Sequence, residues 1–163
     1  MDEKIEKVRK YTILAVETTG CLLLLAIALL VFVQVIMRKV FNSPLAWTEE
    51  VVRIFLVWTS FLGAYVALAE GQHLLMSVFI DRMSARRKNR FKLMTNSMLL
   101  LLLGIVAYYG YEFIAQMGFI PMPVTGIKNF YVYGVMWVSM VLMLAETLLV
   151  EFRILRAIRG NEE

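Results

Sequence analysis

The chain has 163 residues, 60% of them hydrophobic, and its mean hydropathy is +0.70. One soluble core of this size cannot bury so much apolar surface, which excludes an ordinary soluble globular domain and indicates a protein dissolved in lipid. The formal net charge is +4, but the basic residues follow the ends of apolar stretches. That placement favours a membrane protein and argues against a nucleic-acid partner.

Four apolar stretches cover residues 12–37, 47–69, 93–113 and 130–150. Each approaches or exceeds the roughly 20 residues that a helix needs to cross about 30 Å of hydrocarbon. The sequence therefore predicts an all-α membrane protein with four transmembrane helices, forming a single domain over residues 1–163 and leaving no soluble domain. The first stretch ends in Arg38 and Lys39 instead of a small-residue cleavage site, so we expect it to be retained.

Basic residues predict the orientation of these helices. Thirteen of the seventeen lie before the first stretch, between the second and third, or after the fourth: Lys4, Lys7, Arg9, Lys10, Arg82, Arg86, Arg87, Lys88, Arg90, Lys92, Arg153, Arg156 and Arg159. The opposite side carries Arg38, Lys39 and Lys128. Because cytoplasmic loops are enriched in Lys and Arg, we expect both termini and the central loop in the cytoplasm.

The sequence of two connections between the apolar stretches predicts where they lie or how they fold. Residues 74–80 are mostly apolar and precede the central basic run, so we expect them to lie along the membrane surface near anionic lipid. Residues 116–129 contain Pro121 and Pro123, which predict a turn region. Tyrosines on either side of this turn predict an aromatic belt at the outer interface: Tyr108, Tyr109, Tyr111, Tyr131 and Tyr133.

The second stretch begins with charged residues at membrane depth. After Arg53 only sixteen uncharged residues remain, about 24 Å of helix, so Arg53 is expected just inside the outer boundary. Glu49 and Glu50 lie four and three residues before Arg53, and either carboxylate can reach the guanidinium along a helix. The cluster either contacts a partner protein or lipid headgroups, or is a self-paired group whose side chains extend to the outer interface, where Trp47 would anchor the helix. A cation or proton site is the weaker alternative, because Arg53 already supplies the counter-charge.

Small residues follow on the same stretch. Gly63, Ala67 and Gly71 recur at four-residue spacing, which lets another helix approach closely in lipid. The neighbour is either another helix of this chain, the simpler interpretation, or a helix of a partner.

Other candidate groups are few. Glu17 and Glu146 lie near the cytoplasmic ends of their stretches, where they either anchor at the interface or carry protons. His73 is the single histidine and Cys21 the single cysteine, so we expect no haem, metal or other cofactor in this chain. No nucleophile–base pair or phosphate loop is present, and we expect no enzymatic activity.

The second stretch resembles a known family. Its residues Trp47, Thr48, Glu49, Glu50 and Arg53, followed by Phe55, Leu56, Val57, Trp58, Phe61, Leu62, Gly63 and Ala64, and closed by Gly71, Gln72 and His73, are similar to the DctQ-like small subunit of tripartite ATP-independent periplasmic (TRAP) transporters. The motif spans residues 47–73, and Ile120 with Pro121 is similar to an Ile-Pro often found in that family's outer loop.

The resemblance implies a multi-pass protein of the bacterial inner membrane with two partners. A periplasmic substrate-binding protein captures an organic acid such as sialic acid or a C4-dicarboxylate, and a large DctM-like membrane subunit carries it inward with sodium. The small subunit would be a non-catalytic scaffold, and its contacts with partner or lipid would involve Trp47, Glu49, Glu50, Arg53, Trp58, Gly63, Ala67, Gly71 and His73. The alternative is an autonomous, dimeric, proton-coupled exporter with Glu17 as its acid. A third alternative, a membrane anchor for a redox partner, is disfavoured because the sequence lacks the residues that would bind a redox cofactor.

Overall fold

The computed structural model describes residues 2–71 and 85–159, and in these ranges the chain is almost entirely helical. Four helices are present there: α1 (Asp2–Lys39), α2 (Ala46–Ala69), α4 (Ala85–Met117) and α5 (Asn129–Arg159). Each is long and apolar enough to cross a membrane. The predicted fold class, an all-α protein with four membrane-spanning helices, is confirmed.

Three of the helices extend well beyond the predicted apolar stretches. The first helix has 38 residues, about 57 Å, so its charged amino-terminal part continues the same helix past the hydrocarbon. The expected basic loop before the third stretch is instead partly the start of α4, which begins at Ala85. A helix satisfies its own backbone, and Lys and Arg are good helix formers, so nothing forces these segments to unwind where they leave the lipid.

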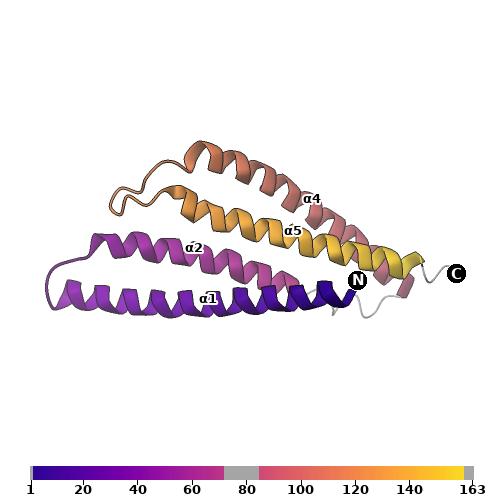
Figure 1. Cartoon of the computed structure of the whole chain (residues 1–163), viewed down its shortest axis with the longest axis horizontal. Helices are drawn as coiled ribbons and strands as arrows, with labels where there is room; N and C mark the ends of the chain where they lie inside the picture. The colour runs from indigo at the N-terminus through magenta and orange to yellow at the C-terminus, as the bar shows by residue number, and fades with distance from the viewer. Residues whose placement is uncertain (1, 72–84, 160–163) are drawn as a thin grey trace.

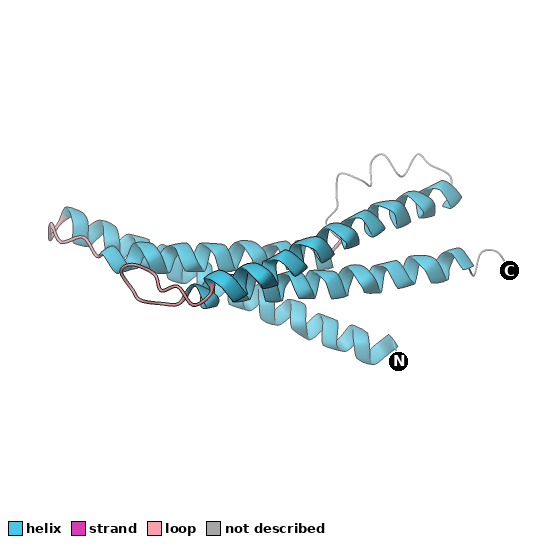
Figure 2. Ribbon diagram, turned by 90° about the horizontal axis from the view of Figure 1, so that it is seen from above, coloured by secondary structure: helices cyan, strands magenta, loops and turns pink. Residues whose placement is uncertain are grey.

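The helices pack in the order α1, α2, α5, α4. Close contacts join α1 to α2, α2 to α5 and α5 to α4, so that α2 and α5 are central and α1 and α4 lie at the edges (Figure 1). The start of α1 and the end of α5 lie at one end of the molecule, called here the termini end. The connections α1–α2 and α4–α5 lie at the opposite, loop end. Seen from above, the helices diverge towards the termini end (Figure 2).

The connection between α4 and α5, residues 118–128, forms a compact hairpin. An isolated antiparallel bridge pairs Pro121 with Lys128, and the Met122 amide donates to the Ile127 carbonyl at 2.9 Å. Gly126 turns the chain with φ = 69°, a conformation that costs glycine little. The predicted turn region is therefore ordered by its own backbone hydrogen bonds.

The hydrophobic core is small and lies between the central helices. Tyr65 and Ala69 of α2 and Met140 and Met143 of α5 are buried. Partly buried side chains from all four helices surround them: Ile13, Val16, Phe61, Val66, Leu68, Leu103, Val106, Met136 and Leu142. By contrast, none of the described side chains of α1 is buried, which fits an edge helix whose outer surface meets lipid.

Candidate functional site

The central helix α2 carries an uncovered face along most of its length. Seven exposed residues recur at intervals that place them on one side of the helix: Glu49, Arg53, Leu56, Ser60, Gly63, Ala64 and Ala67. The opposite side holds buried residues, among them Ile54, Tyr65 and Ala69. We call the seven exposed residues the open face of α2. A helix that has neighbours on two sides thus still leaves one side without a covering helix from this chain.

The small residues of the open face do not pack within the chain. A Cβ atom built on Gly63 would meet nothing within 4 Å, and Ala67 is exposed. The simpler interpretation, close packing against another helix of the same chain, is therefore wrong for the described residues. Gly71 does not belong to this face, because α2 ends at Ala69 and Gly71 follows the helix with φ = 69°. Left-handed residues just after a helix are commonly glycine, so its role here is to terminate α2.

The charged residues at the start of α2 do not pair with one another. Glu50 is 8% exposed and binds the hairpin, accepting hydrogen bonds from the amides of Val124 (3.0 Å) and Thr125 (2.8 Å) and from the Thr125 hydroxyl (2.7 Å). Glu49 accepts a hydrogen bond from the Gln34 side chain of α1 at 3.1 Å. The expected ion pair of either carboxylate with the guanidinium is thus wrong.

Arg53 therefore stands on the open face as an exposed cation. Across residues 2–71 and 85–159 it forms no ion pair within 4 Å. It lies seven residues after the start of α2, about 10 Å along the helix axis. Within this chain its electrostatic neighbour is the Glu50 carboxylate, which is already held by the hairpin. Further anionic or polar groups would stabilise a guanidinium at that depth, since insertion scales give an arginine at the centre of a span a cost of about 2.5 to 3.5 kcal/mol.

The two tryptophans of α2 differ in their surroundings. Trp47 is exposed at the loop end, whereas the Trp58 indole donates a hydrogen bond at 3.0 Å to the Tyr131 carbonyl near the start of α5. Trp58 therefore joins α2 to α5 and is not free to contact a partner through its N–H group. Four of the five tyrosines expected in an aromatic belt are exposed near this end: Tyr108, Tyr109, Tyr111 and Tyr131.

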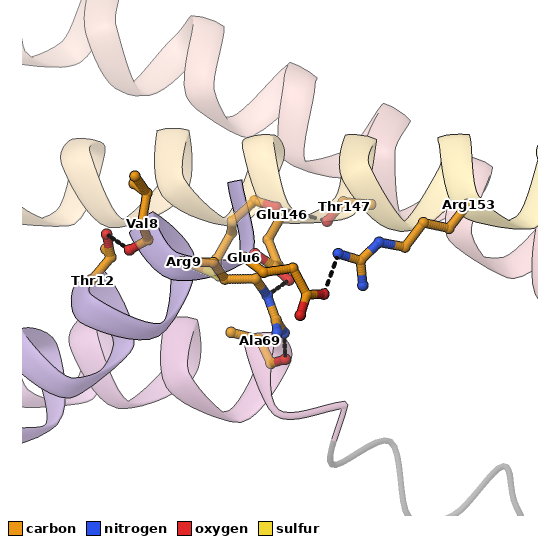
Figure 3. Close-up of polar contacts among 9 residues, drawn as sticks. Glu6, Val8, Arg9, Thr12, Ala69, Glu146, Thr147 and Arg153 are labelled. Atoms are coloured by element: carbon orange, nitrogen blue, oxygen red, sulfur yellow. Dashed lines mark hydrogen bonds and ion pairs between the residues drawn. The ribbon is translucent and has the colours of Figure 1, made fainter. Parts of the chain in front are cut away.

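At the termini end, one arginine joins three helices. Arg9 of α1 pairs with Glu146 of α5, Nε to Oε1 at 2.5 Å, and also donates to the Ala69 carbonyl at the end of α2 (Figure 3). Glu146 is only 6% exposed, so its charge is compensated inside the molecule. Glu146 was expected either to anchor at the interface or to carry protons, and its carboxylate is instead buried against an arginine of this chain.

Sequence reasoning missed the part played by Arg9. The arginine was grouped with the other cations that precede the first apolar stretch, and a cation that binds a buried carboxylate looks identical in sequence to one that faces headgroups. The available signal was Glu146 itself, because an acid inside a predicted span calls for a cationic partner. Nothing in the sequence identified which of thirteen basic residues would supply it.

Further polar contacts join α5 to its other neighbours near the same end. Glu151 accepts hydrogen bonds from Asn96, at 2.5 Å, and from Ser97, at 2.6 Å, both on α4. Arg153 pairs with Glu6 of α1 at 2.9 Å, with both side chains more than half exposed (Figure 3). The diverging helix ends are thus connected by side-chain hydrogen bonds and ion pairs.

The remaining candidates are less connected. Glu17 is exposed on α1, with no hydrogen bond or ion pair to a described residue, and Cys21 is exposed on the same helix. His73 and the apolar segment 74–80 lie outside the described residues. Within the part of the chain that the structure describes, no three His, Cys, Asp or Glu side chains gather in a way that could hold a metal ion.

Comparisons with known proteins agree on one family for this chain. Residues 27–157 match the family described as tripartite ATP-independent periplasmic transporters, DctQ component. A putative TRAP transporter small permease protein of Haemophilus influenzae is 35% identical over 82 residues, which are 50% of this chain and 51% of the relative. The sialic acid TRAP transporter small permease protein SiaQ of Vibrio cholerae is 21% identical over 127 residues, 78% of this chain and 73% of the relative.

A third relative is a much longer protein. The sialic acid TRAP transporter permease protein SiaT of Haemophilus influenzae is 32% identical over 92 residues, which are 56% of this chain but only 14% of that protein. The matched regions thus span about half of the first relative and a small part of SiaT. Because the family match covers most of residues 1–163, membership does not depend on either of these partial alignments.

Four membrane-spanning helices and a permease family together confirm a multi-pass inner-membrane protein with no enzymatic role. The chain belongs to the DctQ family, the small permease components of tripartite ATP-independent periplasmic transporters.

Proposed function

We propose that this protein is a non-catalytic scaffold that binds the large membrane subunit of a TRAP transporter through the open face of α2. The proposal rests on one observation. The central helix α2 packs against α1 and α5, and its remaining side, which is lined by small residues, is not covered by this chain. In lipid, helices associate through close packing and not through the hydrophobic effect, and small residues permit that packing. Lipid chains alone do not require such a smooth surface.

The comparison with SiaT supports a partner in the same membrane. A region similar to this chain makes up 14% of that permease protein, so in SiaT the small-subunit sequence is joined covalently to a far longer chain. We infer that the present chain makes the equivalent contact with a large membrane subunit. The proposed partner is a large DctM-like subunit, because that subunit also lies in the membrane and can present helices to the open face of α2.

Arg53 gives the proposed contact a polar element. It is exposed on the open face next to Leu56 and Ser60, about three turns from Gly63. A helix seated on the small residues would bring its own side chains within reach of the guanidinium, and a carboxylate there would form a charge-assisted pair. Lipid headgroups are the other source of an anion for Arg53.

The orientation of the chain completes the proposal. The charge bias predicts that the termini end faces the cytoplasm, so the loop end with the hairpin would face the periplasm and the substrate-binding protein. Two relatives are named for sialic acid, which makes sialic acid the first substrate to assay, with C4-dicarboxylates next. Sodium coupling belongs to the large subunit in this account, because none of the described helices of this chain is broken in the way that transporter sites require.

Reconstitution tests the proposed role. The chain alone in liposomes is expected to move no solute, and sodium-dependent uptake is expected only when the large subunit and the binding protein are added. Solute movement by the chain alone would contradict the scaffold role and support the proton-coupled exporter, in which case Glu17→Gln should abolish it.

Arg53 is tested separately. The Arg53→Ala protein should co-purify less of the large subunit, or support slower uptake. Its own fold should be retained, because among the described residues the guanidinium forms no ion pair within 4 Å and Glu50 keeps its hydrogen bonds to the hairpin. Full assembly and full uptake by this variant would show that Arg53 has no part in the contact. Reduced assembly in detergent that is restored by added anionic lipid would assign Arg53 to headgroups.

A further inference from the structure

One buried carboxylate joins parts of the chain that are far apart in sequence. Glu50 lies near the start of α2, and its partners Val124 and Thr125 lie about 75 residues later at the turn of the hairpin. Its Oε1 atom accepts the Val124 amide, and its Oε2 atom accepts both the Thr125 amide and the Thr125 hydroxyl. Both oxygens are thus used, and the side chain is only 8% exposed.

The hairpin does not supply these acceptors itself. Its own backbone hydrogen bonds use the amides of Met122, Gly126 and Asn129, which donate to Ile127, Met122 and Ile120 at 2.9, 3.1 and 3.0 Å. The two amides at the turn receive their acceptor from Glu50. The carboxylate thus completes the hydrogen bonding of the turn.

A carboxylate suits this position better than the isosteric amide. Three donors converge on the side chain, and an ionised glutamate is an acceptor at both oxygens. A glutamine would turn its NH₂ group towards one of the fixed amide donors, so that at least one amide would lose its partner. Hydrogen bonds from backbone amides to an ionised carboxylate are also roughly twice as strong as neutral ones.

We propose that Glu50 is a positioning residue that latches the hairpin, residues 118–128, onto α2. The Trp58 contact with the Tyr131 carbonyl is a second connection between α2 and the segment that follows the hairpin. The latch makes the hairpin and the first two turns of α2 move as one body. It also fixes the outward side chains of the hairpin, where Phe119 is 72% exposed and Val124 is 54% exposed.

Hydrogen–deuterium exchange on the purified full chain in a lipid nanodisc tests the latch directly. In the Glu50→Gln variant, the amides of Val124 and Thr125 should exchange about tenfold faster, since a charge-assisted hydrogen bond is replaced by a mismatch. Peptides from the termini end, around Arg9 and Glu146, should keep their exchange rates. This locality separates a positioning role from a general loss of stability.

Two further variants sharpen the result. Glu49→Gln is the matched control, because its carboxylate is adjacent in sequence but binds Gln34 and not the hairpin, and it should leave hairpin exchange unchanged. Thr125→Val removes the hydroxyl, which also accepts the Ile127 amide at 3.4 Å, and keeps both amide bonds to Glu50, so exchange at the Val124 and Thr125 amides should rise by about threefold. If Glu50→Gln does not accumulate as folded protein, Thr125→Val carries the test. Hairpin exchange at the wild-type rate in both Glu50→Gln and Thr125→Val would overturn the proposal, as would an equal rise in Glu49→Gln.

Discussion

The two ends of this helical layer are held together by different chemistry. At the termini end, charged side chains meet one another, as in the Arg9–Glu146 pair and the Arg153–Glu6 pair. At the loop end, side chains of α2 meet main-chain groups, since Glu50 binds two amides and Trp58 binds a carbonyl. The helices diverge at the first end, and at the second a hairpin joins α4 to α5 (Figure 2).

This difference indicates which substitutions should destabilise each end. A pair of side chains fails when either member is replaced, and it leaves the surviving charge without compensation if that charge is buried. Main-chain partners cannot be deleted by substitution, so the bonds of Glu50 and Trp58 to main-chain groups depend on these two side chains of α2. The largest effects are therefore expected from buried charges at the termini end, and the smallest from its exposed charges.

The largest expected effect is that of Arg9→Ala. It leaves the buried Glu146 carboxylate without its cation, at a cost of about 3 to 5 kcal/mol in the free energy of unfolding. Unfolding of the purified chain in mixed micelles, followed by tryptophan fluorescence, measures the loss. The double variant Arg9→Ala with Glu146→Gln should recover much of it, because the uncompensated charge is then gone. Equal stability of the single variant and the wild type would remove the central role given to this pair.

Glu151→Ala should have the next largest effect. The substitution deprives Ser97 of its acceptor and leaves Asn96 with the Thr147 carbonyl alone, which weakens the contact between α4 and α5 by about 1 to 3 kcal/mol. The same unfolding measurement applies, with Glu112→Ala as the control, since Glu112 is exposed on α4 and the structure gives it no hydrogen bond or ion pair. A loss no larger than that of the control would show that these hydrogen bonds add nothing to helix packing.

At the loop end, Trp58→Phe removes one hydrogen bond and keeps an aromatic ring. The expected loss is about 1 kcal/mol, because the Tyr131 carbonyl loses its side-chain donor. Calorimetric unfolding avoids the change in fluorescence that the substitution causes. Trp47→Phe is the control and should cost less, as Trp47 is exposed and makes no hydrogen bond that the structure records. The reverse order of the two tryptophans would contradict the assignment.

The smallest effect is expected for Arg153→Ala. Its pair with Glu6 is exposed on both sides, 55% and 61%, so solvent screening reduces its contribution to between 0 and about 1 kcal/mol. The residual effect should shrink further as salt is added. A loss comparable with that of Arg9→Ala would erase the distinction between buried and exposed charges at the termini end.

Much of the fold could be predicted because lipid imposes simple requirements. Four apolar stretches of sufficient length predicted four helices, and the motif from Trp47 to His73 led to the family that the comparison confirms. The ends of the helices could not be placed, because charged residues that leave the bilayer continue a helix as readily as they end it. Apolar composition determines which part of each helix crosses the lipid and does not determine how far the helix continues outside it.

The partners of individual charges could not be predicted. The rule that residues three or four apart on a helix interact pointed Glu50 to Arg53, yet two main-chain amides 74 and 75 residues away were available and fixed in space. The same limitation hid Arg9, whose partner lies 137 residues away. Spacing identified the small residues of α2, but only the packing order of the helices showed that their side of α2 is uncovered.

One comparison tests the central claim that the open face of α2 binds the large subunit. Gly63→Leu adds a side chain to that face, and Gly104→Leu adds the same side chain to α4, and at both glycines a new Cβ meets nothing within 4 Å in this chain. Each variant is co-expressed with the large subunit, and the amount recovered by affinity purification is measured. The account predicts at least about a tenfold loss of bound large subunit for Gly63→Leu and no loss for Gly104→Leu. Equal recovery with both variants would contradict it.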